Sequence, residues 1–325
     1  MLAAFFNGMV SIYMPAFTAI VADSMPESRR GTGYGVYSTI TMMPNIFSPA
    51  VGGWVMDNYG YVEGLHTFLI LQILVSLLMV AIRWRYTEET ISKPTRTRRA
   101  FISKEIIVDQ SRPIQVMLLV AIIGSFSARL VMDFTNLYAL EVIRLTNTQL
   151  GLISTAVGAF VAVFAFPSGM LSDRYGRKNN IMVARVTNPV TQWLVAFATD
   201  FNGYALARYV NGIAQAMGGG NQTSGGPSWN ALIADIVPPE KRATVIGTQN
   251  TLTAIVGAPS AVLGGWLWQA FSPQTPFMVS GVVGLVAATL FWLGVKEPSK
   301  QEKLATQARR IRERQLQESR QNEHG

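Results

Sequence analysis

The sequence predicts an all-α membrane protein that crosses the bilayer several times, and two features of its charge indicate this. Only 14% of the 325 residues are charged, whereas roughly 25% are charged in soluble proteins. The charges are also clustered, so that residues 1–22, 31–56 and 145–172 contain none and residues 243–295 form an uncharged run of 53. Because a helix needs about 20 apolar residues to cross the hydrocarbon core, each of these stretches is long enough to span a membrane.

The uncharged stretches and the turn signals between them predict nine transmembrane helices. Residues 243–295 divide at the turn cluster SPQTP (272–276), where two prolines would stop a helix. The stretch 203–235 is too long for one simple crossing and contains the run GGGNQTSGGP, so we expect this helix to be broken or partly unwound. The nine expected spans are 2–22, 32–56, 65–82, 114–138, 148–170, 180–199, 203–235, 244–268 and 277–295.

The distribution of Lys and Arg predicts the orientation of the chain. Of the 27 basic residues, 23 lie in alternate connections and in the C-terminal tail, and only Arg144 lies in the opposite connections. Because basic loops stay on the cytoplasmic side, we expect a cytoplasmic C-terminus, with the protein in the plasma membrane. The net charge of +8 follows from this topology, so we expect the lipid bilayer and no nucleic acid as a partner.

The scarcity of reactive side chains argues against an enzyme. The chain has no Cys and only two His, which leaves almost no ligands for zinc, haem or an iron–sulfur cluster. A Ser-His-Asp set and a Walker A phosphate loop are also missing from the sequence. We therefore expect no enzyme activity, no metal and no cofactor.

An internal repeat divides the chain into two unequal halves. Residues 15–54 align without gaps to residues 227–266, with 14 identities in 40 positions. Both copies run in the same direction through the membrane, so the repeat is parallel, which is one way in which transporters build alternating access. The identical pairs include Pro15/Pro227, Asp23/Asp235, Arg30/Arg242, Gly53/Gly265 and Trp54/Trp266.

The repeat also predicts that three helices are missing before the first span. Three expected spans precede the second copy, and none precedes the first, so we expect 9 of 12 helices. The expected organisation is a partial N-terminal bundle (1–86), a cytoplasmic linker (87–113), a six-helix bundle (114–295) and a charged cytoplasmic tail (296–325). We expect a monomer.

The segment GMLSDRYGRK (169–178) resembles the signature G-x-L-A-D-R-x-G-R-K of the major facilitator superfamily, and departs from it only at Ser172. Asp23, Pro26 and Arg30, like residues 235–242, are similar to the D-x-x-P…R elements of that family. The resemblance implies a secondary transporter that moves a small solute by rocking two helix bundles. Gly35 and the SPAVGG segment (48–53) approximate the motif of proton-coupled drug exporters, which adds proton-coupled efflux as one form of this function.

The signature residues predict a cytoplasmic gate between the bundles. Asp173 is a carboxylate suited to the free N–H groups and dipole at the start of another helix, and the helix after Arg242 is its expected target. The alternative is that Arg177 and Lys178 only set the topology. The predicted gate residues are Gly169, Asp173, Arg174, Gly176, Arg177, Lys178, Asp235, Arg242, Asp23 and Arg30.

Ionisable and amide side chains inside the spans are the candidates for coupling and for substrate binding. Arg129 and Asp133 are four residues apart, so we expect them to share one helix face and to pair; the alternative is a purely structural pair. Arg208, in an R-x-x-x-G element similar to that of the family, is a third coupling candidate, and Arg185 is expected to extend its side chain to the inner interface. The substrate-binding candidates, which could equally bond neighbouring helices, are Asn136, Asn211 and Gln215.

Two other interpretations stay open on the sequence. One is a membrane sensor or receptor that uses this scaffold without transport. The other is an inactive, N-terminally truncated fragment of a transporter.

Overall fold

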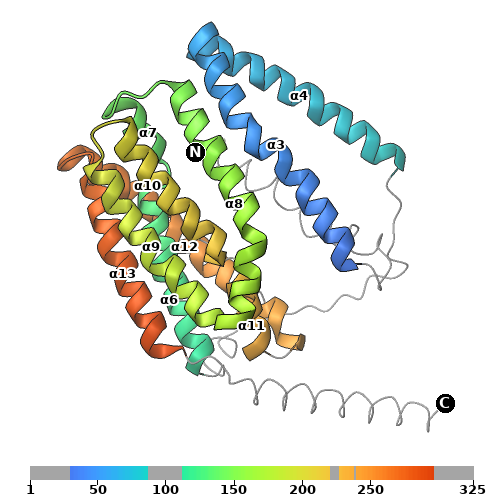
Figure 1. Cartoon of the computed structure of the whole chain (residues 1–325), viewed down its shortest axis with the longest axis vertical. Helices are drawn as coiled ribbons and strands as arrows, with labels where there is room; N and C mark the ends of the chain where they lie inside the picture. The colour runs from blue at the N-terminus through green and yellow to red at the C-terminus, as the bar shows by residue number, and fades with distance from the viewer. Residues whose placement is uncertain (1–29, 87–111, 220–226, 238, 296–325) are drawn as a thin grey trace.

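The computed structural model of the chain describes residues 30–86, 112–219, 227–237 and 239–295, and these residues are helical with short connections. Figure 1 shows the arrangement of the helices. The helices are α3 (Arg30–Tyr59), α4 (Tyr61–Tyr86), α6 (Arg112–Val131), α7 (Phe134–Glu141), α8 (Asn147–Tyr175), α9 (Arg177–Phe197), α10 (Phe201–Ala214), the π-helix Gln215–Gly219, α11 (Pro227–Ile236), α12 (Pro239–Ala270) and α13 (Thr275–Gly294).

Five of the described segments are long and apolar enough to cross a membrane. In α4, large apolar side chains such as Leu69, Leu74 and Leu78 are exposed, which is typical of a surface that faces lipid. The five segments are Tyr61–Arg85, Arg112–Glu141, Asn147–Phe164, Val245–Ala270 and Thr275–Gly294.

Each expected span from 32–56 onward coincides with described helical structure, either one helix or several consecutive helices. The span 203–235 is described as α10, the π-helix and α11, and most of the glycine run at which the sequence predicts a break (220–226) lies outside the described residues. The span 114–138 is broken at Met132 and Asp133, which the sequence does not predict. The first span, 2–22, lies outside the described residues, as do the tail 296–325 and most of the linker 87–113, so nine helices and these domain boundaries stay predictions.

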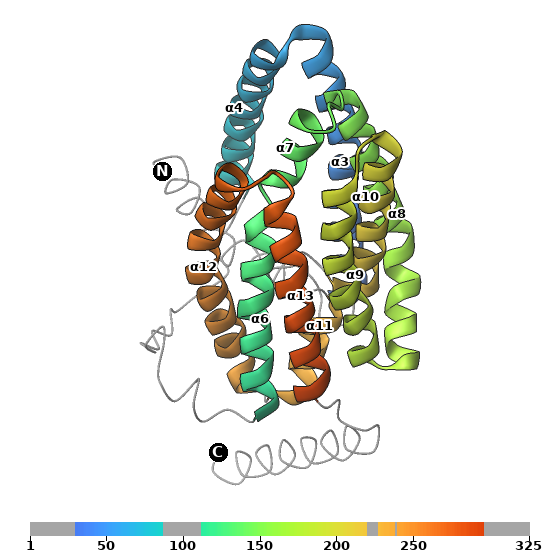
Figure 2. The same ribbon diagram turned by 90° about the vertical axis from the view of Figure 1, so that its left-hand side faces the viewer.

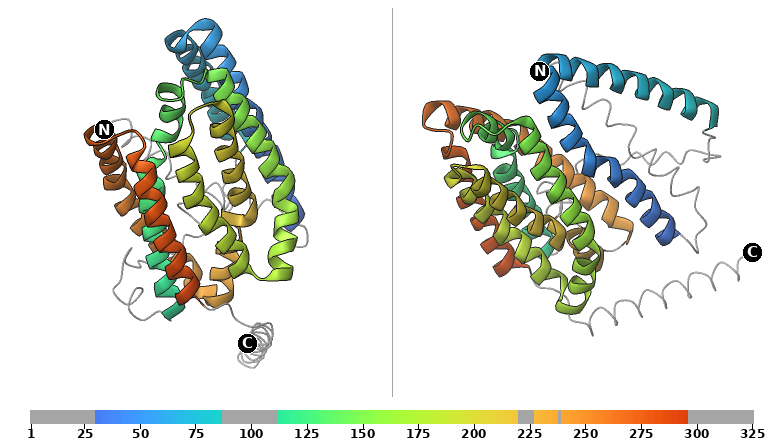
Figure 3. Two further views of the ribbon diagram at one scale, coloured as in Figure 1. Left: turned by 60° about the vertical axis from the view of Figure 1, so that its left-hand side comes forward. Right: turned by 45° about the horizontal axis from the view of Figure 1, so that its top comes forward.

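Helices α6 to α13 form one bundle, and α3 and α4 stand beside it. In the bundle α6 packs against both α12 and α13, and lies between them in Figure 2. The helix α3 packs along α8, and α4 follows α3 on the side away from the bundle in Figure 1 and in the right-hand view of Figure 3.

The bundle core consists of two apolar clusters with polar side chains between them. One cluster includes Leu130, Tyr138, Val195, Tyr204 and Phe277. The other cluster lies toward the opposite end of the bundle. It includes Met117, Ile181, Trp229, Val245 and Phe291. The buried polar side chains that separate the clusters along the helices include Ser125, Ser127, Asn211, Gln249, Thr253 and Ser280. This polar layer positions the candidate site.

Candidate substrate site and gates

The polar layer contains the change from α-helix to π-helix within the expected span 203–235. The α-helix α10 ends at Ala214 and continues as the π-helix Gln215–Gly219, and α11 begins at Pro227. A proline fits the first turn of a helix because its missing N–H would have had no partner there. π-Helical turns occur frequently at functional sites, and interrupted membrane helices hold solutes in transporters. The interruption is therefore the first part of a candidate binding site.

A chain of three amide side chains joins α9, α10 and the π-helix. The Nε2 of Gln215 donates to Oδ1 of Asn211 at 2.6 Å, and Nδ2 of Asn211 donates to Oδ1 of Asn188 at 3.0 Å. Asn211 is buried, whereas the Gln215 side chain is exposed. The structure thus brings the two amide candidates, Asn211 and Gln215, together, and it adds Asn188, which the sequence analysis does not single out.

Arg185 lies on the same face of α9 as Asn188, because residues three apart on a helix are neighbours. The Cζ of its guanidinium is 4.8 Å from the centre of the Trp229 ring in α11. Its Nη1 lies against Gly124 of α6, where an added methyl group would collide with it. Arg185 therefore points into the bundle, and the prediction that it extends to the inner interface is wrong.

The position of Arg185 in its helix explains this correction. It lies eight residues after the start of α9 at Arg177, which is about 12 Å along the helix axis. The spacing of Arg185, Asn188 and Gln192 along one helix face is a sequence signal that could have identified this polar stripe.

Hydrogen bonds and ring contacts fix the Trp229 ring on which Arg185 lies. Trp229 is buried, and its Nε1 donates to Oε1 of the buried Gln249 in α12 at 3.1 Å. Its ring centre is 5.7 Å from that of Phe291 in α13. Next to it, Nδ2 of Asn180 donates to Oγ of Ser228 at 3.0 Å. Trp229 is thus a rigid platform inside the bundle.

The predicted pair of Arg129 and Asp133 does not form. The helix α6 ends at Val131 and α7 begins at Phe134, so a turn at Met132 and Asp133 separates the two helices within the apolar segment Arg112–Glu141. Both side chains are exposed, and among the described residues no ion pair joins them. The Cγ of Arg129 instead lies near Gly257 of α12. Asn136 is exposed on α7, away from the amide chain on α9 and α10.

Arg208 lies on α10, three residues before Asn211 in the amide chain, and it is half-buried. Its Nε is buried without a hydrogen-bond partner among the described residues. One turn earlier, the hydroxyl of Tyr204 donates to the carbonyl oxygen of Thr135 at 3.4 Å. Arg208 therefore keeps an unused donor inside the bundle, which fits its place among the coupling candidates.

The predicted gate motif forms the turn between α8 and α9. Gly176 has φ 94° and ψ 144°, a backbone conformation that residues other than glycine rarely adopt. The Nζ of Lys178 donates to the carbonyl oxygen of Trp292 at 2.7 Å and lies 4.6 Å from its ring centre. A cation is favoured there because the carbonyl end of α13 carries partial negative charge.

The remaining gate residues are only partly described. Arg174 is exposed and Arg177 is half-buried at this turn. Asp23 and the side chains of Asp173, Asp235, Arg242 and Arg30 lie outside what the structure describes, as do the surroundings of Gly169. The contact predicted between Asp173 and the helix after Arg242 therefore stays a prediction.

At the opposite end of the bundle, Asp57 of α3 caps the first turn of α8. Its Oδ1 accepts from the backbone N–H of Asn147 at 3.1 Å and from Nδ2 of Asn147 at 2.8 Å, and its Oδ2 accepts from the N–H of Thr148 at 2.6 Å. The first N–H groups of a helix have no partner within it and favour a carboxylate. Asp57 supplies such a partner from another helix.

The hydrogen bonds to Asp57 lower its pKa. This residue follows the expected span 32–56 and lies at the end of α3. Partial burial raises the pKa of the Asp57 carboxyl, but the bonds from Thr148 and Asn147 outweigh it and bring the pKa from 3.8 down to about 2. The carboxyl is therefore ionised at neutral pH.

Small residues let the backbones of α3 and α8 approach closely beside Asp57. A methyl group added at Gly53 would collide with the carbonyl of Asn147, and one at Gly151 would collide with the carbonyl of Pro49. The N–H of Ala50 donates to Oγ1 of Thr155 at 3.2 Å. This contact is not predictable from the sequence, because nothing in the chain indicates that α8 is the neighbour of α3.

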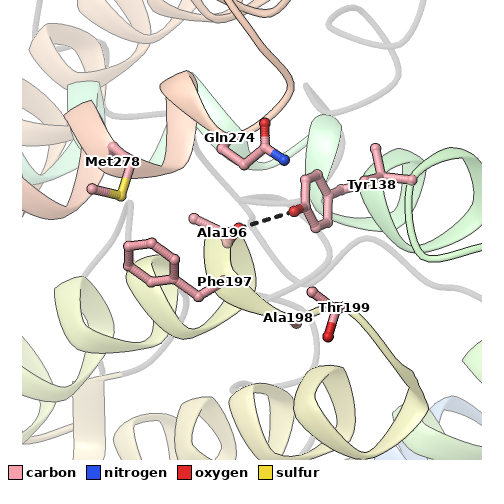
Figure 4. Close-up of a pocket in the computed structure, with 8 residues that line it drawn as sticks. Tyr138, Ala196, Phe197, Ala198, Thr199, Gln274 and Met278 are labelled. Atoms are coloured by element: carbon pink, nitrogen blue, oxygen red, sulfur yellow. Dashed lines mark hydrogen bonds between the residues drawn. The ribbon is translucent and has the colours of Figure 1, made fainter.

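A separate open cavity of about 400 Å³ lies between α7, the end of α9 and the start of α13. The hydroxyl of Tyr138 donates across it to the carbonyl oxygen of Ala196 at 2.9 Å, as Figure 4 shows. Its lining is mainly apolar and includes Phe197 and Met278, with Gln274 as a polar member. Because it lies in the apolar cluster of Tyr138 rather than in the polar layer, it is distinct from the candidate site.

Comparison with known proteins matches almost the whole chain to one family. The family model described as Major Facilitator Superfamily matches residues 1–149 and 117–321. A hexuronate transporter of Bacillus subtilis (strain 168) is 31% identical over 185 residues, which are 57% of this chain and 42% of that protein. A homolog of the multi-drug resistance efflux pump PmrA in Lactococcus lactis subsp. lactis (strain IL1403) is 26% identical over 245 residues, which are 74% of this chain and 56% of that protein. The chain thus spans about half the length of these relatives.

Solved structures show the same fold. A bacterial homolog of the human lysosomal transporter Spinster, in an inward-facing and unoccupied conformation, superposes with a TM-score of 0.60 at 13% identity. The match covers 86% of this chain and 74% of that one. A POT family transporter in complex with 5-aminolevulinic acid matches with a TM-score of 0.57 at 14% identity, over 86% of this chain and 72% of that one.

Proposed function

Because this chain belongs to the Major Facilitator Superfamily, a family of membrane transporters, we propose that it moves a small solute across the membrane by alternating access. In this mechanism two groups of helices close the solute path at one side while they open it at the other. The relatives named above are a hexuronate transporter and a drug efflux pump, so sugar acids and drugs are the two solute classes to consider.

The observation that supports the proposal most is the uneven contact between α3 and α8. At the Asp57 end the two helices are joined by the hydrogen bonds of Asp57 and by the close approach at Gly53 and Gly151. Toward the other end they draw apart in Figure 1 and in the right-hand view of Figure 3. In the orientation that the basic loops predict, the closed end is the outer one, so this arrangement corresponds to a path closed to the outside.

The bonds at Asp57 are suited to reversible closure. Hydrogen bonds to charged groups contribute roughly 1.5–3 kcal/mol each when they are protected from water, but Asp57 is exposed, and water can replace them. Two conformations that differ by a few kcal/mol can exchange when a solute binds one of them better. We therefore propose that Asp57 is the outer gate of the transporter.

The solute site in this proposal is the polar layer around α10 and the π-helix Gln215–Gly219. Asn188, Asn211 and Gln215 contribute amide groups there, and Arg185 and Trp229 contribute a cation and a ring. The exposed amide of Gln215 can hydrogen-bond a solute without first breaking the packing of the bundle.

The inner gate and the proton coupling belong to the same proposal. The turn at Gly176 would move with α8 and α9, and Asp173 would contact the helix after Arg242 when the inner side closes. Asp133, Arg129 and Arg208 are the candidates for coupling to H⁺. Asp133 is exposed at the break between α6 and α7.

The proposed outer gate can be tested with a single cysteine, because the chain has none. With an Ala50→Cys reporter, a membrane-impermeant maleimide added outside should label slowly when α3 and α8 are in contact. Adding Asp57→Asn, which keeps the shape and removes the charge, should increase the labelling rate several-fold.

The matched control is Glu63→Gln, since Glu63 is an exposed acid near the same end of the molecule, on α4. It should leave the labelling rate unchanged. Equal labelling in the presence and absence of the Asp57 charge would contradict its role as the gate.

A further inference from the structure

Arg185 is a cation inside the bundle, and no described carboxylate lies beside it. Among the described side chains it forms no ion pair, and it lies against the Trp229 ring and the backbone at Gly124. Burying a cation without a partner costs free energy, and contact with an aromatic face compensates only part of that cost. A guanidinium has five N–H donors, and the contact with a ring face uses none of them.

The surroundings hold the guanidinium at this point. Trp229 is fixed by its bond to Gln249 and by the Phe291 ring. Gly124 leaves room for Nη1, which any larger residue would displace. Arg185 is only partly buried, and it lies one helical turn from Asn188, which ends the amide chain. A positioned, partly exposed guanidinium beside an amide chain is suited to receive an anion.

We propose that Arg185 binds the carboxylate of a monoanionic organic solute, and that Trp229 and Gly124 position it to do so. This inference rests on the proposed transport function and specifies the class of solute for the same site. Among the residues that form the site, namely Arg185, Asn188, Asn211, Gln215 and Trp229, Arg185 is the charged one, and Arg208 lies one turn before Asn211 on α10. At Arg185 itself, one guanidinium neutralises one negative charge, whereas a phosphate monoester would leave a second charge uncompensated there.

The uncharged members of the site match the rest of such a solute. Gln215 is exposed, and its amide can bond hydroxyl groups in either direction because it both donates and accepts. Asn188 lies one turn of α9 beyond Arg185 and already receives a bond from Asn211. A carboxylate on Arg185 would thus place neighbouring hydroxyl groups toward the amide chain.

Binding to the purified full chain in lipid nanodiscs, measured by calorimetry, tests this inference. Four probes share one sugar ring: D-glucuronate carries a carboxylate, D-glucose is neutral, D-glucosamine is a cation and D-glucose 6-phosphate is a dianion. Lactate and benzoate extend the carboxylates to smaller and aromatic solutes. We expect at least one carboxylate to bind more tightly than every neutral, cationic or phosphorylated probe.

Variants of the site give the second arm of the test. Arg185→Gln should weaken binding of that carboxylate about 10- to 100-fold, since it removes charge-assisted hydrogen bonds. Arg185→Lys should weaken it less than Arg185→Gln does, because it keeps the charge but loses the planar fork. Gly124→Ala should also weaken it by displacing Nη1. The control Arg144→Gln removes an exposed arginine between α7 and α8 and should leave binding unchanged.

The outcomes separate this inference from the proposed function. Three results would overturn the inference. The first is that a neutral, cationic or phosphorylated probe binds more tightly than every carboxylate, and the second is that no carboxylate binds. The third is that wild type and Arg185→Gln bind the carboxylate equally well. The same probes are added to the Ala50→Cys labelling assay. If a non-carboxylate probe changes labelling, transport survives and only the solute class is wrong; if no probe of any charge changes it, the alternating-access proposal loses its support as well.

Discussion

Trp54 and Trp266, 212 positions apart in the sequence, each make an edge-to-face contact with the aromatic residue five positions further on. The ring centres of Trp54 and Tyr59 are 6.2 Å apart at 78°, and those of Trp266 and Phe271 are 5.5 Å apart at 83°. Both tryptophans are about half exposed, at 52% and 56%. Equivalent positions of the two repeat copies thus have the same local surroundings, which supports a duplication.

The two copies use their glycines against different neighbours. In α3, Gly53 approaches the carbonyl of Asn147 in α8, whereas its equivalent in α12, Gly265, lies against the Phe134 ring, and the neighbouring Gly264 approaches the carbonyl of Leu130 in α6. The repeat position of Asp57 is occupied by Gln269. The capping bond between α3 and α8 is therefore a property of the first copy alone.

The neighbouring glycines of α3 give the first prediction. A methyl group at Gly53 would collide with α8, whereas one at Gly52 would meet nothing within 4 Å. Overpacking typically costs about 1–3 kcal/mol, so Gly53→Ala should separate α3 from α8 and raise the labelling rate of an Ala50→Cys reporter. Gly52→Ala is the matched control and should label like the parent. Similar rates for the two alanine variants would contradict the close contact.

The pKa of Asp57 gives the second prediction. Because its pKa is lowered to about 2, the free energy that the charge contributes to the closed contact is present above about pH 4 and is lost as the pH falls through about 2. Labelling of the Ala50→Cys reporter should therefore be insensitive to pH between 5 and 8, after correction for the reactivity of the thiol. An increase in corrected labelling between pH 7 and pH 5 that disappears in Asp57→Asn would show a higher pKa than the hydrogen bonds imply.

The turn at Gly176 gives the third prediction. Its φ of 94° is strained for any residue with a side chain, and such conformations cost roughly 1–3 kcal/mol. Gly176→Ala should therefore lower the thermal unfolding temperature of the purified protein. Gly247→Ala is the control, since Gly247 lies within α12 and a methyl group there would meet nothing within 4 Å. A Gly176→Ala protein as stable as Gly247→Ala would mean that the turn can relax without cost.

The sequence predicts the helices well because membrane spans are determined by a local property, the length of an uncharged apolar run. It predicts a break within the span 203–235 for the same reason, since the glycine run around Gly219 and the proline at 227 are local signals. The break at Met132 and Asp133 carries no Gly or Pro, so it depends on tertiary packing and is missed.

The candidate site is only partly predictable, because some of its contacts are local in the sequence and others depend on tertiary packing. Asn211 and Gln215 lie on consecutive turns, and their spacing alone indicates that they meet. Asp57 and Arg185 gain their significance from helices far away in the sequence, namely α8, α6 and α11. Charge and periodicity do not specify which helix lies beside which, so the contact between α3 and α8 and the cation on Trp229 require the structure.

The separation of Arg129 from Asp133 gives the last prediction. If the two residues formed an ion pair, replacing both would cost less than the sum of the single replacements. In the structure they are divided by the break between α6 and α7, and both are exposed. In a double-mutant cycle with Arg129→Gln and Asp133→Asn, the effects on the free energy of unfolding should therefore add to within about 0.5 kcal/mol. The same cycle on the pH dependence of transport should assign any loss of proton coupling to Asp133→Asn alone. An interaction energy well above that limit would mean that the two side chains pair in another conformation of the transport cycle, and that the break between α6 and α7 closes when they do.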